Sequence, residues 1–453
     1  MTQHVHQFAN FVTSCTPESL TPEARTAATV FLMDTVAVGI AGSGAPEAHR
    51  VLSAARRWGS GDTAHVLGTG AKLPTSSAAY VNAFQIHCQE YDCLHERATV
   101  HAMAVVGGAL LAVAEARQLS GVELLLGVAL GVEVAVTLGL AAGGGLAFFR
   151  PATAGALGAS AALARLTQQS ESGFLDMWGL TYSQLAGTMQ AHVEGSVALP
   201  LQIAAGARAA VTSLDLLECG LSGPHDILDG PFGYYALFED GGDLSSVVND
   251  LGNPWRVTEL SHKPFPTGRA AHGALDGLLQ LAAEHSLTLA NLAEVRVRAP
   301  ALIHRLVARP SHDTMNRSYA RLCLQYLVPK LIRDGSIDLT SFGEGALRDE
   351  EVLRFGQRVR ISIDEAADPH AMRPQTVDID LASGETVTQA VPHTLGSPER
   401  PLTQERRLAK VDHCLKFAGI DSERASQLKE RLQDVWELDD TSRLVALTSP
   451  STA

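Results

Sequence analysis

Residues 101–145 read HAMAVVGGALLAVAEARQLSGVELLLGVALGVEVAVTLGLAAGGG, the longest apolar region of the chain. Two stretches within it are hydrophobic on nearly every side, which is typical of helices inside a bundle rather than on its surface. Glu115, Arg117, Glu123 and Glu133 interrupt the run, and these charges break any uninterrupted membrane span. This region therefore predicts buried helices and no membrane segment.

The helical pattern extends from the start of the chain to about Ser261. Residues 21–42, TPEARTAATVFLMDTVAVGIAG, open with a Thr suited to capping and a Pro suited to the first helical position, and they end in Gly. Residues 151–168 are rich in Ala, which allows close packing of helices, and residues 202–220 have the pattern of another buried helix. We expect a mainly α protein with a large all-helical domain.

The pattern changes after residues 262–269, HKPFPTGR. Residues 292–301 and 357–365 alternate apolar and polar side chains, as half-buried strands do. Residues 375–391 predict two strands joined by a turn at Ser383-Gly384. A helical stretch lies at residues 318–335. These features predict a smaller α+β lid domain with an antiparallel sheet.

The expected domain boundaries follow from these changes of pattern. Residues 1–263 and 399–453 form the helical domain, because the tail is helical again, and residues 264–398 form the lid. A cleft between the two domains is the usual place for a small-molecule site.

Composition narrows the class of protein. The chain has 453 residues, of which 46% are hydrophobic and 19% charged, and this supports sizeable buried cores. A formal charge of −14 repels phosphate backbones, so we expect no nucleic-acid partner. The N-terminal residues lack a signal-peptide pattern, and six cysteines in a chain of this length are no disulfide framework. We expect a cytoplasmic protein.

Residues 87–102, HCQEYDCLHERATVHA, concentrate titratable groups. The histidines and cysteines at positions 87, 88, 93 and 95 have no paired C-x-x-C and match no closed zinc pattern, so we expect no metal. Acid/base chemistry is the better functional interpretation. Glu90, Asp92 and His95 share the short segment, and His101 stands where an apolar helix begins. The alternative is a polar loop that only caps this helix.

Two other segments carry candidate groups. Arg150 follows a Gly run and precedes a helix start, where its guanidinium and free helix N–H groups, including that of Thr153, would hold a carboxylate. Lys263 lies in a segment stiffened by two prolines at the domain boundary, and Arg269 follows it. An exposed arginine and a solvated lysine in an ordinary hinge are the alternatives.

Tyr326 lies seven residues after Tyr319 on one expected helix, so the two tyrosines would share a face. Most such tyrosines belong to the core.

Taken together, these segments resemble the MmgE/PrpD family, over nearly the whole chain. The resemblance is carried by MDTVAVGIAGS, NAFQIHCQEYDCLHERATVHAMAVVGGALLAVAEA, FFRPATAGALGASAALARL, HKPFPTGRAAHGALDGLLQL and ARLCLQYLVPKLIRDG. The family includes 2-methylcitrate dehydratase, cis-aconitate decarboxylase and iminodisuccinate epimerase. The resemblance implies a homodimer with a mainly helical domain and an α+β lid, and no cofactor or metal.

The resemblance also assigns residues one by one. Asp92 matches one acid of the family's polar signature, Glu90 replaces another, and His101 matches a later His. Arg150 stands where the family has a general acid/base His, and a lysine of several members is lost around Leu199. Two further positions match the family's pattern: Lys263 and Tyr326.

The expected activity is cofactor-independent proton abstraction beside a carboxylate of a small di- or tricarboxylic acid. Lys263 or His101 would be the base, and His101, Tyr326 or Glu90 would return a proton or assist a leaving group. Arg150 and Arg269, with His95 and Thr153, would bind the substrate. We expect most of all a dehydratase of the 2-methylcitrate type. The alternatives are an epimerase of an iminodisuccinate-like dicarboxylate, a cis-aconitate-type decarboxylase, and a non-catalytic relative.

Overall fold

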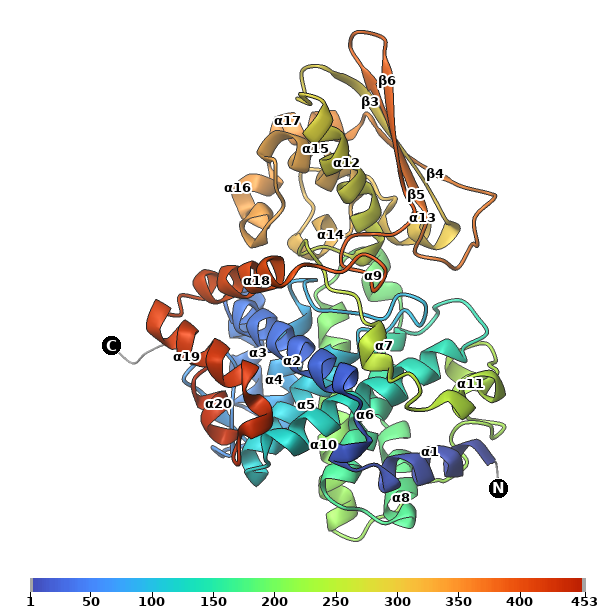
Figure 1. Ribbon diagram of the computed structural model, residues 1–453, viewed down its shortest axis with the longest axis vertical. Helices are drawn as coiled ribbons and strands as arrows, with labels where there is room; N and C mark the ends of the chain where they lie inside the picture. Colours follow the sequence, from blue (N-terminus) through green and yellow to red (C-terminus); the bar gives the residue numbers. More distant parts are fainter. Residues whose placement is uncertain (1–2, 450–453) are drawn as a thin grey trace.

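Helices α5 (Ala102–Arg117) and α6 (Gly121–Leu140) form the centre of a helical body in the computed structural model, which describes residues 3–449 (Figure 1). Nearly every residue of both helices is buried, as their all-round apolar sequence predicts. Both α2 (Pro22–Ser43) and α6 are long and apolar enough to cross a membrane, yet most of each lies buried among neighbouring helices. Burial of this kind is what the core helices of a helical bundle require.

The remaining helices of the body pack around this centre. α7 (Arg150–Leu166) packs along α6, and α4 (Thr75–His87) packs along α5. The other helices of the body are α1 (Gln3–Ser14), α3 (Pro46–Ala55), α8 (Glu171–Tyr182), α9 (Gln190–Glu194), α10 (Ala198–Glu218) and α11 (Tyr234–Phe238), with a small β1 (Ala64–His65) and β2 (Lys72–Leu73) ladder.

The expected start of α2 is observed. The Thr21 hydroxyl accepts a hydrogen bond from the backbone N–H of Ala24 at 3.2 Å, and Pro22 occupies the first helical position. Such a cap satisfies one of the free N–H groups of a helix start.

The smaller α+β region lies above the body in Figure 1 and contains a sheet of four strands in the order β4-β3-β5-β6. Its strands are β3 (Leu292–Ala299), β4 (Val359–Ile363), β5 (Gln375–Leu381) and β6 (Thr386–Val391). Its helices are α12 (His272–Glu284), α13 (Ala301–Val307), α14 (Arg317–Ala320), α15 (Leu324–Asp334), α16 (Glu344–Leu347) and α17 (Glu350–Gly356).

The expectation of an antiparallel sheet needs one correction. β5 pairs antiparallel with β3 and with β6, and the β5–β6 turn contains Gly384 at φ 92°. β3 and β4, however, are parallel. The chain between them runs through α13 to α17 and returns to the same end of the sheet, as a parallel crossover requires.

A second correction concerns the helix expected over residues 318–335. It is divided into α14 and α15, with Arg321 to Cys323 between them. Tyr319 and Tyr326 therefore do not share one helical face.

The C-terminal helices lie against the helical body. They are α18 (Gln404–Phe417), α19 (Ser422–Gln433) and α20 (Ser442–Ala446), and they pack on α2 and α5 (Figure 1). Along the sequence, the chain thus forms most of the helical body, continues into the α+β region, and then returns to the body.

Candidate active site

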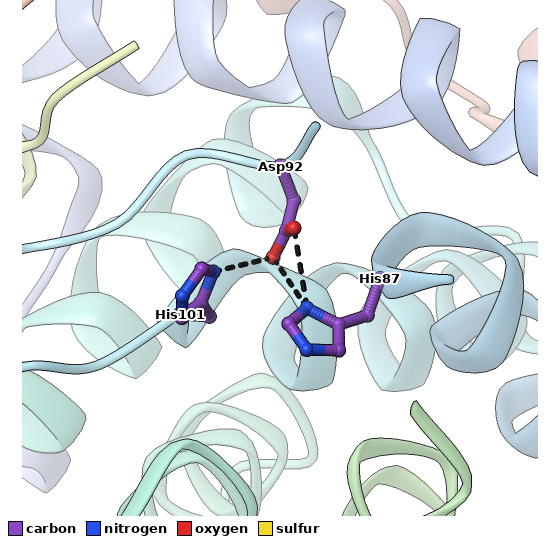
Figure 2. Close-up of side chains that lie close together, drawn as sticks. All are labelled: His87, Asp92 and His101. Atoms are coloured by element: carbon purple, nitrogen blue, oxygen red, sulfur yellow. Dashed lines mark hydrogen bonds and ion pairs between the residues drawn. The ribbon is translucent and has the colours of Figure 1, made fainter. Parts of the chain in front are cut away.

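The polar segment of residues 88–101 connects the end of α4 to the start of α5 and gathers three side chains at one point (Figure 2). His87 is the last residue of α4, His101 occupies the N-cap position of α5, and Asp92 lies in the loop between them. Because the two helices pack along each other, the loop brings both imidazoles onto the Asp92 carboxylate.

The hydrogen bonds at Asp92 define the tautomer of His101. Asp92 Oδ2 lies 2.9 Å from Nδ1 of His101, and its two oxygens lie 3.2 and 3.1 Å from Nδ1 of His87. An ionised carboxylate only accepts, so Nδ1 of each imidazole donates. In neutral His101 this leaves the lone pair on Nε2, which is the atom that a general base uses.

Burial and the charges within the cluster shift the pKa values of the two histidines in opposite directions. Burial raises the pKa of Asp92, but His87, His101 and Lys263 outweigh burial and hold it well below its ordinary value. Burial lowers the pKa of His101, and Asp92 does not fully offset this, so the pKa stays below 6.5. For His87 the nearby carboxylates outweigh burial and raise the pKa. The pKa of His87 is thus the higher of the two, and His101 is the histidine that stays neutral at neutral pH.

Lys263 reaches this cluster from a distant part of the sequence. A short antiparallel bridge between Leu94 and Ser261 aligns the two segments. The Lys263 ammonium donates to the backbone carbonyl of Glu90 at 3.1 Å and to its carboxylate at 2.9 Å, and it lies 3.9 Å from Asp92. Burial would raise the pKa of Glu90, but Lys263 and the two histidines lower it to about 2. Lys263, Glu90, Asp92 and the two histidines therefore form one buried polar cluster.

A cavity of about 60 Å³ lies beside this group, between the body and the α+β region. One water requires roughly 10–15 Å³ of such space, so the cavity holds a few waters or part of a small ligand. Its walls are mostly apolar, and its polar lining residues are Glu90, Thr99, His101, His192 and Arg269. The lining residues come from both regions, so the cavity lies between them.

Backbone strain coincides with the cavity wall. Glu90 and Thr99 both have left-handed conformations, with φ of 51° and 53°. Non-glycine residues adopt this region at an energetic cost, and such strain gathers at functional sites. Here it turns the polar segment toward the cavity.

The grouping of His87, Asp92 and His101 also has the spacing of a small metal site, since their ligand atoms lie within 4.8 Å of one another. Both Nδ1 atoms are already engaged with the carboxylate, and the Lys263 ammonium 3.9 Å from Asp92 repels a cation. Hydrogen bonding accounts for this geometry without a metal.

Arg150 was expected to bind the substrate, but the structure does not bring it to the cavity. Its guanidinium donates to Glu239 at 2.8 to 3.0 Å and to the carbonyls of Ala98 and Gly144, and it does not line the cavity. Thr153 belongs to the same network, since its hydroxyl lies 3.1 Å from the Tyr234 hydroxyl, which donates to Glu239. Both residues hold the body together, because the buried guanidinium is paired with a buried carboxylate.

Arg269 lines the cavity, but its donors are committed. Its Nε and Nη2 donate to Glu96 at 2.9 and 2.7 Å, and its Nη1 donates to backbone carbonyls, including that of Leu395. His95 lies outside, in a larger open groove of about 590 Å³, and its Nε2 donates to Glu259 at 3.1 Å. Met372 lines both the groove and the cavity.

Tyr326 is fully buried in the α+β region and does not line the cavity. Its hydroxyl donates to the carbonyl of Ser341 at 2.6 Å. The predicted proton-transfer role does not fit this position, because the break between α14 and α15 turns the tyrosine into the core.

The sequence prediction missed His192 and Arg309. His192 lies on α9 and lines the cavity, and Arg309 follows α13 in the α+β region and contacts it. The two are 117 residues apart, and neither stands in a polar cluster that would have marked it.

Two comparisons place these features among known proteins. The family model described as the MmgE/PrpD N-terminal domain matches residues 6–246, and the MmgE/PrpD C-terminal domain matches residues 265–438. The chain is 26% identical to the cis-aconitate decarboxylase of Mus musculus, over 91% of this chain and 87% of that protein. It is 24% identical to the cis-aconitate decarboxylase of Aspergillus terreus, over 98% and 94%, and to a cis-aconitate decarboxylase-like protein of Aspergillus oryzae, over 98% and 96%.

Proposed function

The chain belongs to the MmgE/PrpD family, and from this premise we propose that it is a lyase that removes a proton beside a carboxylate of a small di- or tricarboxylic acid. The observation that carries the proposal is the Asp92–His101 pair, whose His101 lines the cavity. The reaction proposed first is loss of water from a β-hydroxy acid, as in a dehydratase of the 2-methylcitrate type.

In this mechanism His101 is the base. Its Nε2 takes the proton from the carbon beside the carboxylate, and the resulting imidazolium is stabilised by Asp92. The electron pair of the broken C–H bond forms the carbon–carbon double bond, and the β-hydroxyl leaves. His101 returns its proton to the departing oxygen, so water is released and the enzyme regains its starting state.

Lys263 supports this step without touching the substrate. It is fully buried and fixes Glu90, which lines the cavity next to His101. A mostly apolar cavity strengthens such electrostatic interactions, because it screens them less than bulk water does.

A decarboxylase is the second candidate, because the relatives compared above carry the name cis-aconitate decarboxylase. An epimerase that uses two groups requires a proton acceptor on one face of the substrate and a proton donor on the other. Among the described residues that line the cavity, His101 is the histidine with a free lone pair, since that of His192 is taken by Arg309. This difference is why elimination is proposed ahead of epimerisation.

NMR of product mixtures in heavy water tests the proposal. The panel contains citrate, 2-methylcitrate, cis-aconitate and amino-dicarboxylates. New alkene signals from a hydroxy acid support the dehydratase, and loss of one carboxyl carbon from cis-aconitate supports the decarboxylase instead. Deuterium incorporated at a stereocentre, with no alkene formed, would contradict both lyase activities and support the epimerase. If no compound of the panel is transformed, the proposed lyase is overturned.

A further inference from the structure

The cavity is also lined by a histidine that the proposed proton transfer does not use. His192 lines the wall contributed by α9, beside Met189 of the same segment. Behind it lies Arg309, whose Nη2 approaches His192 Nδ1 to 3.3 Å. The contact joins the helical body to the α+β region at the cavity.

The partner of His192 fixes its tautomer. A guanidinium only donates hydrogen bonds, so Nδ1 must be the accepting nitrogen and the ring proton is on Nε2. Burial, together with Arg309 and Arg305, lowers the pKa of His192 to about 4, and Glu90 acts in the opposite direction. His192 is therefore a neutral N–H donor near neutral pH, and it has no free lone pair with which to act as a base.

Arg309 itself has spare hydrogen-bonding capacity. Its Nη2 also donates to the carbonyl of Leu306, whereas its buried Nη1 has no hydrogen-bond partner. A buried donor of this kind is costly unless an acceptor arrives. Among the other cations near the cavity, Lys263 pairs with Glu90 and Arg269 with Glu96, and Arg305 donates to the carbonyl of Leu146.

We propose that His192 and Arg309 form the seat for a second carboxylate of the substrate. His192 Nε2–H donates to a carboxylate oxygen, and the guanidinium supplies the compensating charge. The inference deepens the proposed function, on which it rests, by requiring at least two carboxylates: one beside the carbon that His101 deprotonates, and one at this seat. Monocarboxylic acids are therefore poor ligands.

Calorimetric binding of tricarballylate tests the seat without turnover, because this tricarboxylate has no hydroxyl to lose. Hydrogen bonds to charged groups are among the stronger ones in proteins, so we expect His192→Leu and Arg309→Met each to weaken binding about 10- to 100-fold. His192→Gln retains an N–H donor and should recover part of the affinity. Propionate should bind the wild type far more weakly than tricarballylate.

Matched controls come from exposed pairs elsewhere: His225→Leu removes a partner of Asp176, and Arg298→Met a partner of Asp378. Neither should change binding. Thermal unfolding of each variant verifies that it is folded.

A second measurement depends on neither binding nor turnover. ¹⁵N NMR of histidine should show His192 as a neutral Nε2–H tautomer at pH 6 in the wild type, and Arg309→Met should raise its pKa.

The seat is overturned if the wild type binds no di- or tricarboxylate, if folded variants bind as the wild type does, or if the His192 tautomer is Nδ1–H. Binding that depends on the seat, in a protein that transforms no acid of the panel, would instead refute the proposed lyase and leave the seat standing.

Discussion

At the scale of single residues, Asp92 determines what the two histidines do. It is fully buried and accepts from both imidazoles, so it holds each ring in one orientation. The bond to His101 Nδ1 leaves its Nε2 as an acceptor. The carboxylate acts on the reaction through His101 and is a positioning residue.

We expect Asp92→Asn to reduce kcat about 10²- to 10⁴-fold, the usual contribution of a positioned general base. The amide can donate to His101 Nδ1 and so favour the wrong tautomer. Steady-state kinetics on the substrate found in the panel measures the loss, and thermal unfolding checks the fold. Cys219→Ser, at an exposed position, is the matched control. Activity close to wild type would remove the Asp92–His101 pair from the mechanism.

The pH profile of the same reaction follows from His101. A base must be neutral, and the pKa of His101 lies below 6.5 because of burial and the Lys263 charge, with Asp92 acting in the opposite direction. We expect kcat/KM to stay constant from neutral pH down to below 6.5 and to fall as pH drops through the lowered pKa. Glu90, with a pKa of about 2, stays ionised throughout this range. An acid limb centred above 6.5 would contradict this assignment.

At the scale of elements, the site depends on how closely the core helices approach. Small residues make this possible: a Cβ at Gly158 of α7 would lie 2.3 Å from the carbonyl oxygen of Gly131 on α6. α7 begins beside the cavity at Phe149 and Pro151. The glycine contact therefore sets the position of one cavity wall.

Gly158→Ala should destabilise the protein by about 1–3 kcal/mol, the usual effect of overpacking a dense core. The added methyl group meets backbone, which cannot rotate away. Urea unfolding measures the change. The matched control is Gly345→Ala on α16, where an added Cβ meets nothing within 4 Å. That change should be neutral or slightly stabilising, and equal effects at both positions would refute the close-packing argument.

At the scale of the whole molecule, the returning C-terminal helices are tied to the site. Lys410 of α18 is buried, pairs with Asp34 of α2 at 2.7 Å, and donates to the carbonyl of Tyr91 at 2.8 Å. Tyr91 stands between Glu90 and Asp92 in the polar segment. The tail thus supports that segment as well as the core.

Lys410→Met should destabilise the protein by about 3–5 kcal/mol, because it leaves Asp34 as a buried unpaired charge. The double variant Asp34→Asn, Lys410→Met should recover much of this loss, since neither charge remains. Lys429→Met, which breaks an exposed pair with Asp412, should change stability by less than about 1 kcal/mol. Urea unfolding of the four proteins is the measurement. If Lys410→Met is at least as stable as the double variant, the argument from the buried ion pair is contradicted.

The family resemblance also predicts a homodimer. Light scattering during size-exclusion chromatography should give twice the chain mass of 47.9 kDa, and a monomer at micromolar concentration would refute this expectation.

The sequence by itself determined the mainly α fold, the family, and the His101–Asp92–Glu90 segment, because periodic burial and a dense polar cluster are local signals. Only the tertiary structure decided which cationic side chains are already paired with a carboxylate of the protein. Arg150 is paired with Glu239 and Arg269 with Glu96, whereas His192 and Arg309 meet across 117 residues. Whether a charge is available depends on which partner the fold places beside it, and a linear pattern does not encode contacts between distant residues.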